Sequence, residues 1–402
     1  MCLSIFSQSL LKTQILFLFV VVVGLPLPVA GQDGWNQINS CVLNRSGVDS
    51  KKKITAIAFV DEKHGVLGGS SGFVRYTRNG GISWQKSAFD PPFSNIGITD
   101  DVQRIVVNET TIYLVCYKRV FRSQDGGARW SLVNTPPPAG YRILGASTTV
   151  FFYDGAFVEN RGWILGAAYD STGSKFLGAF VVFLDLHEER PKPPQVDKLP
   201  VNDASNEMLQ ISFSDRDHGW IVGQKGSILS TDDGGNNWTV QRNLPPQMSV
   251  EAISNVSATG SPDSPAPDLY GVYFQDKRKG WIVGNRATIL FTNDGGDTWV
   301  PARVQGTFPG DNQTTFTQVQ FINNDVGWIV GKNGNILRSS DGGETWVPQF
   351  SGTSQVLYTI AMDGETSGWA AGAADTLLRY DAMPSTQMQP RTKGGKRRGD
   401  RL

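Results

Sequence analysis

The segment "HGWIVGQKGSILSTDDGGNNW" (218–238) is one copy of a sequence that recurs along the chain. Two further copies are "KGWIVGNRATILFTNDGGDTW" (279–299) and "VGWIVGKNGNILRSSDGGETW" (326–346), and a more divergent copy is "HGVLGGSSGFVRYTRNGGISW" (64–84). In all four copies the early glycine precedes the closing tryptophan by 19 positions. Such a fixed spacing indicates a repeat protein, in which each copy forms one structural unit.

Each copy alternates short apolar runs with turns. In the quoted copy, strands are predicted over 209–214, 219–223, 227–231 and 236–241, separated by "DRDH", "QKG" and "DDGG". Strands this short do not bury a core within one unit. Four-stranded units that recur about every 40–60 residues are typical of a β-propeller, so the predicted fold class is all-β.

The turn before the last strand of a copy carries the motif Ser/Thr-x-Asp-x-Gly-x-x-Trp, the Asp-box or bacterial neuraminidase repeat. Its acidic side chain can accept hydrogen bonds from the backbone of its own turn, its glycine supplies positive φ, and its tryptophan packs beneath. We therefore predict a structural role for the motif residues. They are Thr77, Asn79, Gly81 and Trp84 in a weakened first copy, then Ser123, Asp125, Gly127 and Trp130, Thr231, Asp233, Gly235 and Trp238, Thr292, Asp294, Gly296 and Trp299, and Ser339, Asp341, Gly343 and Trp346.

Seven blades are predicted from the first strand of each unit. The third unit (151–170) keeps the Gly-Trp strand but has no Asp-box, and the seventh (357–381) stops after three strands. The segment "GWNQIN" (34–39) resembles the end of a unit, so we expect it to pair with the strand ending near Arg379 and to close the ring. The sequence therefore predicts a single propeller domain over residues 33–381. The predicted blades start near Ile54, Val102, Phe151, Leu209, Tyr270, Thr317 and Leu357.

The two ends of the chain differ from the repeats. The run "ILFLFVVVVGLPLPVAG" (15–31) predicts a signal peptide over 1–31, cleaved near Ala30 or Gly31, and hence an exported protein. Because Pro28 disfavours cleavage, an uncleaved membrane anchor is the alternative. Residues 382–402 end in "RTKGGKRRGDRL" and are predicted to form a disordered basic tail. The alternative is that this tail contacts anionic lipid or a partner.

Composition argues against several function classes. The 37 basic and 37 acidic residues balance, which removes the electrostatic footprint of a nucleic-acid-binding protein. The three histidines are scattered singly, so neither a metal cluster nor a cofactor site is predicted. After cleavage only Cys41 and Cys116 remain. Buried free thiols are favoured over a disulfide, because the two cysteines would fall in different units.

Recognition is predicted on one face of the propeller. Asp-boxes join third and fourth strands and occupy one face, whereas connections between blades build the other face and the channel mouth. The connections are long and variable, and the longest, at 243–268, is rich in proline, serine and alanine. They span 86–101, 131–149, 184–208, 241–268 and 301–315.

The repeat resembles the photosystem II assembly and stability factor family. "GWIVGNRATILFTNDGGDTW" (280–299) carries this resemblance best, and it extends over about 33–381. The resemblance implies a seven-bladed Asp-box propeller in the thylakoid lumen of a photosynthetic source, or otherwise in the periplasm or outside the cell. It further implies a non-catalytic scaffold that holds a protein client, such as a newly made membrane-protein subunit.

A sialidase-like glycan-binding protein or exo-glycosidase is the alternative, because sialidases share the Asp-box. Such enzymes need three arginines on the substrate carboxylate and a tyrosine nucleophile. Arg104, Arg142 and Arg161, with Tyr141 nearby, can be proposed for these roles. However, the early Arg-Ile-Pro signature is replaced by "AIAFVDEKHG" (56–65), and no Gly-x-Ser-x-Gly elbow occurs.

Overall fold

The computed structural model describes residues 34–38, 52–93, 97–133, 149–186, 195–200, 206–241 and 266–382. The predicted signal peptide, the basic tail beyond residue 382 and most of the longest connection lie outside these residues. Among the described residues, no helix has the length and apolar composition needed to cross a membrane.

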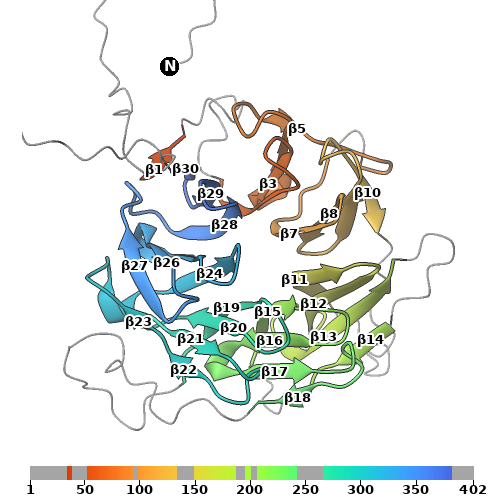
Figure 1. Ribbon diagram of the computed structural model, residues 1–402. Helices are drawn as coiled ribbons and strands as arrows, with labels where there is room; N and C mark the ends of the chain where they lie inside the picture. The colour runs from red at the N-terminus through yellow and green to blue at the C-terminus, as the bar shows by residue number, and fades with distance from the viewer. Residues whose placement is uncertain are drawn as a thin grey trace, which may run out of the picture.

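Seven sheets are arranged around a central axis as the blades of a β-propeller (Figure 1), which confirms the predicted fold class. Each blade starts within two residues of its predicted position. Blade 1 contains β2 (Ile54–Phe59), β3 (Gly65–Gly69), β4 (Val74–Thr77) and β5 (Gln85–Lys86). Blade 2 contains β7 (Val102–Asn108), β8 (Thr111–Cys116), β9 (Val120–Ser123) and β10 (Arg129–Val133). Blade 3 contains β11 (Thr149–Val158), β12 (Arg161–Tyr169), β13 (Phe176–Asp185) and β14 (Gln195–Lys198).

The remaining blades follow the same order. Blade 4 contains β15 (Met208–Phe213), β16 (Gly219–Gly223), β17 (Ile228–Thr231) and β18 (Thr239–Val240). Blade 5 contains β19 (Leu269–Phe274), β20 (Gly280–Gly284), β21 (Ile289–Thr292) and β22 (Val300–Pro301). Blade 6 contains β24 (Phe316–Phe321), β25 (Gly327–Gly331), β26 (Ile336–Ser339) and β27 (Thr345–Gln349). Blade 7 contains β28 (Leu357–Asp363), β29 (Ser367–Gly372) and β30 (Leu377–Asp381). Short 3₁₀ turns are η2 (Ser70–Gly72), η4 (Gln224–Gly226), η6 (Asp311–Gln313) and η7 (Lys332–Gly334).

Two blades carry a fifth strand that the sequence did not predict. After completing blade 1, the chain forms β6 (Ala88–Phe89), which pairs in parallel with β10 of blade 2. After completing blade 5, it forms β23 (Arg303–Val304), which pairs in parallel with β27 of blade 6. Each added strand covers an outer sheet edge with backbone from the preceding blade and links the two blades.

The N-terminal strand closes the ring, as the sequence predicted. β1 (Gly34–Gln37) pairs antiparallel with β30, with Gly34 opposite Asp381 and Gln37 opposite Leu378. Figure 1 shows β1 in red beside the blue strands of blade 7. Its Trp35 is 6% exposed, and its ring centroid lies 5.7 Å from that of Trp328 in blade 6. The first strand therefore contributes both backbone pairing and packed apolar surface to the last blade.

Aromatic stacks join neighbouring blades. At several interfaces, the aromatic residue of a second strand stacks on the residue that ends the first strand of the next blade. Ring centroids lie 3.4–3.7 Å apart for Trp163 on Phe213, Trp220 on Phe274 and Trp281 on Phe321. Each of these indoles also donates a hydrogen bond to a glycine carbonyl in the Asp-box turn of the next blade: Gly234 (2.8 Å), Gly295 (2.8 Å) and Gly342 (3.2 Å). The repeated Gly-Trp therefore holds one blade against the next.

Candidate functional site

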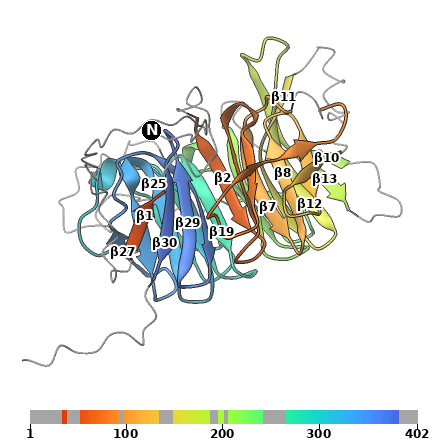
Figure 2. The ribbon, with the colours of Figure 1, turned by 90° about the horizontal axis from the view of Figure 1, so that it is seen from above.

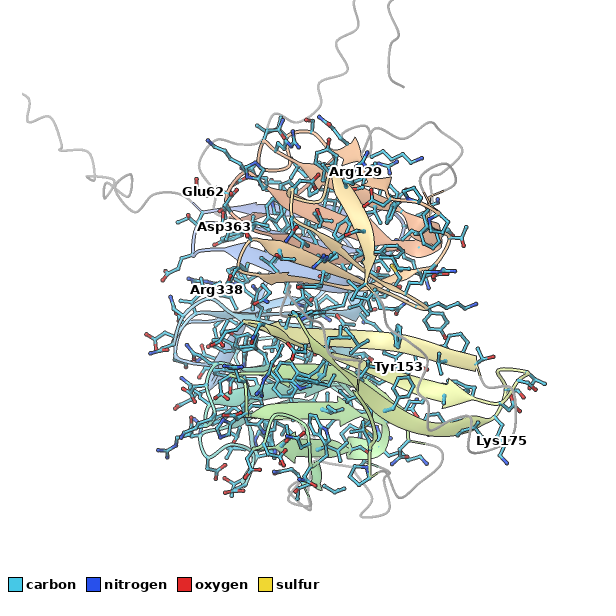
Figure 3. The ribbon with its side chains drawn as sticks, turned by 90° about the vertical axis from the view of Figure 1, so that its right-hand side faces the viewer. Glu62, Arg129, Tyr153, Lys175, Arg338 and Asp363 are labelled. Carbon is cyan, nitrogen blue, oxygen red and sulfur yellow. The ribbon has the colours of Figure 1, made fainter. Side chains whose placement is uncertain are left out.

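The propeller presents two different faces. Asp-box turns lie beside the turns between first and second strands, as the 2.8 Å hydrogen bond from Gly234 N–H to Asp217 C=O illustrates. In Figure 3, Glu62 and Asp363 lie toward this side and Lys175 lies at the opposite edge of the molecule. We call the side that carries the Asp-box turns the Asp-box face. We call the opposite side the loop-rich face, because the connections between blades end on it.

The Asp-box residues engage their polar atoms within their own turns. In blade 4, the Thr231 hydroxyl donates to the Asp233 carboxylate (2.8 Å) and accepts from Gly235 N–H (3.0 Å), while Asp233 Oδ1 accepts from Asn237 N–H (2.9 Å). The same three bonds recur in the other four turns. The motif glycines have φ between 80° and 98°, a region that glycine adopts readily. The structural role of these residues stays a prediction, which the stability and acid measurements below test.

The motif tryptophans are not equally buried. Trp84, Trp130, Trp299 and Trp346 are at most 4% exposed. Trp238 is only half-buried, although its ring still meets Phe213 edge-on at 6.0 Å. The sequence did not distinguish these five positions, since the motif is the same in all of them.

We expect the Asp-box carboxylates to make folding stability sensitive to acid. Burial acts to raise the pKa of Asp294, but hydrogen bonds from Thr298 and from the Thr292 hydroxyl outweigh burial and lower it to about 2. The pKa values of Asp233 and Asp341 are lowered by hydrogen bonds of the same kind, again against burial. A carboxylate whose pKa is lower in the folded chain stabilises the fold above its unfolded pKa, and this stabilisation disappears as the pH falls toward the folded value.

We therefore expect the urea midpoint to stay level from about pH 7 to 5 and to fall between about pH 4 and 2. Asp294→Asn should show a smaller fall over the same range, because the amide keeps an acceptor for Thr298 N–H but does not titrate. Asn79 already performs this role in blade 1, where it accepts from Ser83 N–H at 3.0 Å. An Asp294→Asn profile identical to that of the unmodified protein would show that this carboxylate has no share in the acid response.

A central channel runs between the first strands of the blades. It encloses about 420 Å³, and its lining combines apolar side chains with polar and charged ones, namely Asp61, Arg104, Ser212, Gln318, Gln320, Thr359 and Asp363. Gln318 accepts a hydrogen bond from Ile360 N–H (3.0 Å), and Gln320 accepts from Met362 N–H (3.2 Å). These amide oxygens therefore bind the next blade, as the Asp-box residues bind their own turns.

Arg104 and Arg161, two members of the proposed sialidase-like triplet, have different partners. Arg104 Nε lies 3.4 Å from a carboxylate oxygen of Asp154, a buried residue whose other oxygen accepts from Ile211 N–H (3.0 Å). Burial raises the pKa of Asp154, and the Arg104 charge opposes that rise. Arg161 instead donates to Arg216 C=O (3.1 Å) on the Asp-box face. Arg142 and Tyr141 lie outside the described residues.

Blade 3 extends beyond its neighbours on the loop-rich face. Its first three strands contain 10, 9 and 10 residues, whereas the corresponding strands of the other blades contain four to seven. The added residues lie at the start of β11 and at the end of β12, where Thr149 pairs with Tyr169. Figure 2 shows these strands rising past the other blades, and Figure 3 shows Lys175 at their far end.

Four aromatic residues gather where this extension meets blade 2. Tyr117 stacks on Phe151 with ring centroids 4.3 Å apart, and Phe151 meets Tyr169 at 5.5 Å and 60°. Tyr153, labelled in Figure 3, lies 6.2 Å from Tyr117. All four side chains are half-buried. We call these residues the tyrosine cluster.

A hydrogen-bonded chain fixes the tyrosine cluster to blade 4. The Tyr153 and Tyr169 hydroxyls are 2.7 Å apart, and Tyr169 donates to the carboxylate of Glu207. Burial, together with the hydrogen bond to Glu207, raises the pKa of Tyr169 to about 12. Burial also raises the pKa of Tyr153, so both hydroxyls stay protonated at neutral pH. Because Tyr169 donates its proton to Glu207, the Tyr153 hydroxyl donates to Tyr169, and both oxygens can still accept hydrogen bonds on a partly apolar surface.

No binding residue was predicted from the sequence, and the tyrosine cluster was not among the predicted site residues. Its signal was present in "FFYDGAF" (151–157) and "AAYD" (167–170), where aromatic residues continue past the length of a normal blade strand. Only the folded chain brings Tyr117 from blade 2 and Glu207 from blade 4 to the same place.

Comparison with known proteins agrees with this architecture. The family model "Photosynthesis system II assembly factor YCF48" matches residues 188–261, 264–350 and 311–381. The chain is a photosystem II assembly factor-like propeller. A photosystem II assembly lipoprotein Ycf48 from Synechococcus sp. (strain CC9902) is 29% identical over 103 residues, which are 26% of each chain. The chloroplastic photosystem II stability/assembly factor HCF136 of Oryza sativa subsp. japonica is 36% identical over 117 residues, 28% of this chain and 24% of that protein. The matched part thus spans about a quarter of these assembly factor relatives.

Solved structures share the fold of this assembly factor-like chain. YCF48 from Cyanidioschyzon merolae covers 87% of the chain at a TM-score of 0.55 and 18% identity, with 98% of that structure covered. Virginiamycin B lyase from Staphylococcus aureus, an enzyme, covers 88% at a TM-score of 0.57 and 12% identity, with 100% of it covered. Similarity at this level establishes the propeller fold alone, because one fold serves many functions.

Proposed function

We propose that this protein is an exported, non-catalytic scaffold that binds a protein client through its loop-rich face and assists the client's assembly. The client class suggested by the relatives is a membrane-protein subunit, since their names describe photosystem II assembly and stability factors. Export follows from the predicted signal peptide, with the periplasm, the cell exterior or, in a photosynthetic source, the thylakoid lumen as the compartment. The names of the relatives, one a lipoprotein and one chloroplastic, support such a location.

The tyrosine cluster is the observation that carries this proposal. Binding energy at protein interfaces concentrates in a few residues, with tyrosine, tryptophan and arginine most frequent among them. Tyr117 and Phe151 are half-buried, stacked and placed on the face where the connections between blades end. By contrast, the acidic residues of the Asp-boxes already serve as acceptors in their own turns.

The test is a crosslinking pull-down from the exported fraction, with the full chain as bait. The double variant Tyr117→Ala, Phe151→Ala should reduce client recovery by about tenfold or more, the result of losing at least ~1.4 kcal/mol of binding energy. The matched control is Ile82→Ala, which removes an apolar side chain that is 70% exposed in an Asp-box turn on the opposite face. This control should leave recovery unchanged.

A parallel screen with chromogenic sialic-acid and neutral-sugar substrates addresses the glycosidase alternative. We expect no turnover from the full chain. Turnover that disappears in Arg104→Ala, together with unchanged client recovery from the Tyr117 and Phe151 double variant, would contradict the scaffold function.

A further inference from the structure

The aromatic rings of the tyrosine cluster offer π-faces at an angle to one another. Tyr117 and Phe151 are nearly parallel, at 20°, and Tyr169 is turned by 60° relative to Phe151. None of these side chains is fully buried. Ring faces that remain accessible attract cations through their quadrupoles, and the attraction grows when solvent is excluded.

Two acidic residues, Glu207 and Asp101, lie near these rings. The carboxylate of Glu207 accepts from Tyr169 through one oxygen and receives a long contact of 3.4 Å from the Gln224 amide on the other. No lysine or arginine in the described part of the chain pairs with Glu207. In the same turn of blade 2, Lys118 follows Tyr117 and is exposed, and Arg119 is engaged with Asp100 and lies 5.1 Å from the Phe93 ring centroid.

The negative charges act on the hydroxyl of Tyr117. Burial, and then the negative charges of Glu207 and Asp101, raise the pKa of the Tyr117 hydroxyl. A positive group placed over this ring would therefore meet both a π-face and a negative field. Glu207 also keeps spare acceptor capacity, because a carboxylate can accept about four hydrogen bonds.

We propose that the tyrosine cluster and Glu207 recognise a lysine or arginine side chain that the client presents, a proposal that rests on the proposed function. The aliphatic stem of such a residue packs along the half-buried rings, while its charged end reaches Glu207. A neutral residue of equal length would give Glu207 no counter-charge, and an acidic residue would be repelled, so the site selects by charge as well as by shape.

The experiment titrates the mature chain with N-acetyl-lysine amide, N-acetyl-arginine amide and N-acetyl-norleucine amide, the neutral isostere. Binding is followed by the NMR signals of labelled tyrosine rings. The two cationic compounds should shift the Tyr117 signal in a saturable way, and norleucine should not. Glu207→Gln, which keeps an acceptor for Tyr169, should lower the affinity for the two cationic compounds about fivefold or more.

Glu159→Gln is the matched control, because Glu159 is 59% exposed on the Asp-box face and pairs with Arg216 at 3.4 Å. This variant should leave the affinity for the two cationic compounds unchanged. Equal binding of norleucine, or equal affinity in Glu207→Gln and the unmodified protein, would overturn the charge recognition. Client recovery separates the two proposals: the double variant of Tyr117 and Phe151 tests the face itself, whereas Glu207→Gln tests only its preference for a cation.

Discussion

Replacing Trp346 with alanine should lower the free energy of unfolding by about 3–5 kcal/mol, the range observed when a buried aromatic residue leaves a cavity. Trp346 is 0% exposed, and its ring meets Phe321 edge-on at 5.7 Å. Its indole N–H donates to Gly343 C=O at 3.0 Å, so the variant also loses a bond to its own Asp-box turn. Urea unfolding followed by tryptophan fluorescence and circular dichroism measures the change.

Trp238→Ala is the internal comparison, because Trp238 has the same place in the motif but is only half-buried. Trp238→Ala should lower the free energy of unfolding by clearly less than Trp346→Ala does. Less apolar surface returns to water, and the residues around Trp238 can relax into the space. If both variants unfolded at the same urea concentration as the unmodified protein, the structural role predicted for the Asp-box would be wrong.

Deleting residues 33–39 behind a substitute signal peptide should make the protein aggregate. The deletion removes β1 and with it the backbone partners of β30 from Leu378 to Asp381. It also removes Trp35, which packs against Trp328 and Tyr380 at 5.7 and 5.2 Å. Blade 7 would then expose both an unpaired strand edge and apolar surface, which together favour pairing with other chains.

Size-exclusion chromatography with light scattering, and urea unfolding of any remaining monomer, measure this outcome. Removing residues 383–402 is the control, because that truncation starts beyond β30 and leaves the ring closed. A shortened protein lacking 33–39 that stayed monomeric and equally stable would show that the ring does not depend on its N-terminal strand.

The repeat made most of the fold predictable from the sequence. The Gly-Trp strand and the Asp-box recur at a constant distance, and each depends on contacts inside one unit or with the next unit. Seven starting positions could therefore be found from local pattern alone, and Thr149, where β11 begins, lies two residues from its predicted start at Phe151. Ring closure was predictable for the same reason, because a blade with three strands needs a fourth from elsewhere in the chain.

The parallel strands β6 and β23 could not be predicted in this way. Each has two residues and gains its pairing only from the next blade, so the local sequence around Ala88 and Arg303 carries no strand pattern of its own. The different burial of the motif tryptophans could not be predicted from the sequence either. Trp238 and Trp346 have the same place in the motif, but Trp346 pairs with Val304 of the added strand β23, whereas the blade 4 sheet of β15 to β18 has no added strand beside Trp238.

The sequence by itself determined the repeat unit, the number of blades and the strand that closes the ring, because these follow from periodic local patterns. Only the tertiary structure decided where a candidate binding surface lies. Tyr117, Tyr153 and Glu207 come from three different blades, and no spacing in the chain relates them. They meet because blade 3 is longer than its neighbours and carries its aromatic residues past the ring, beside the turn of blade 2 and the first strand of blade 4.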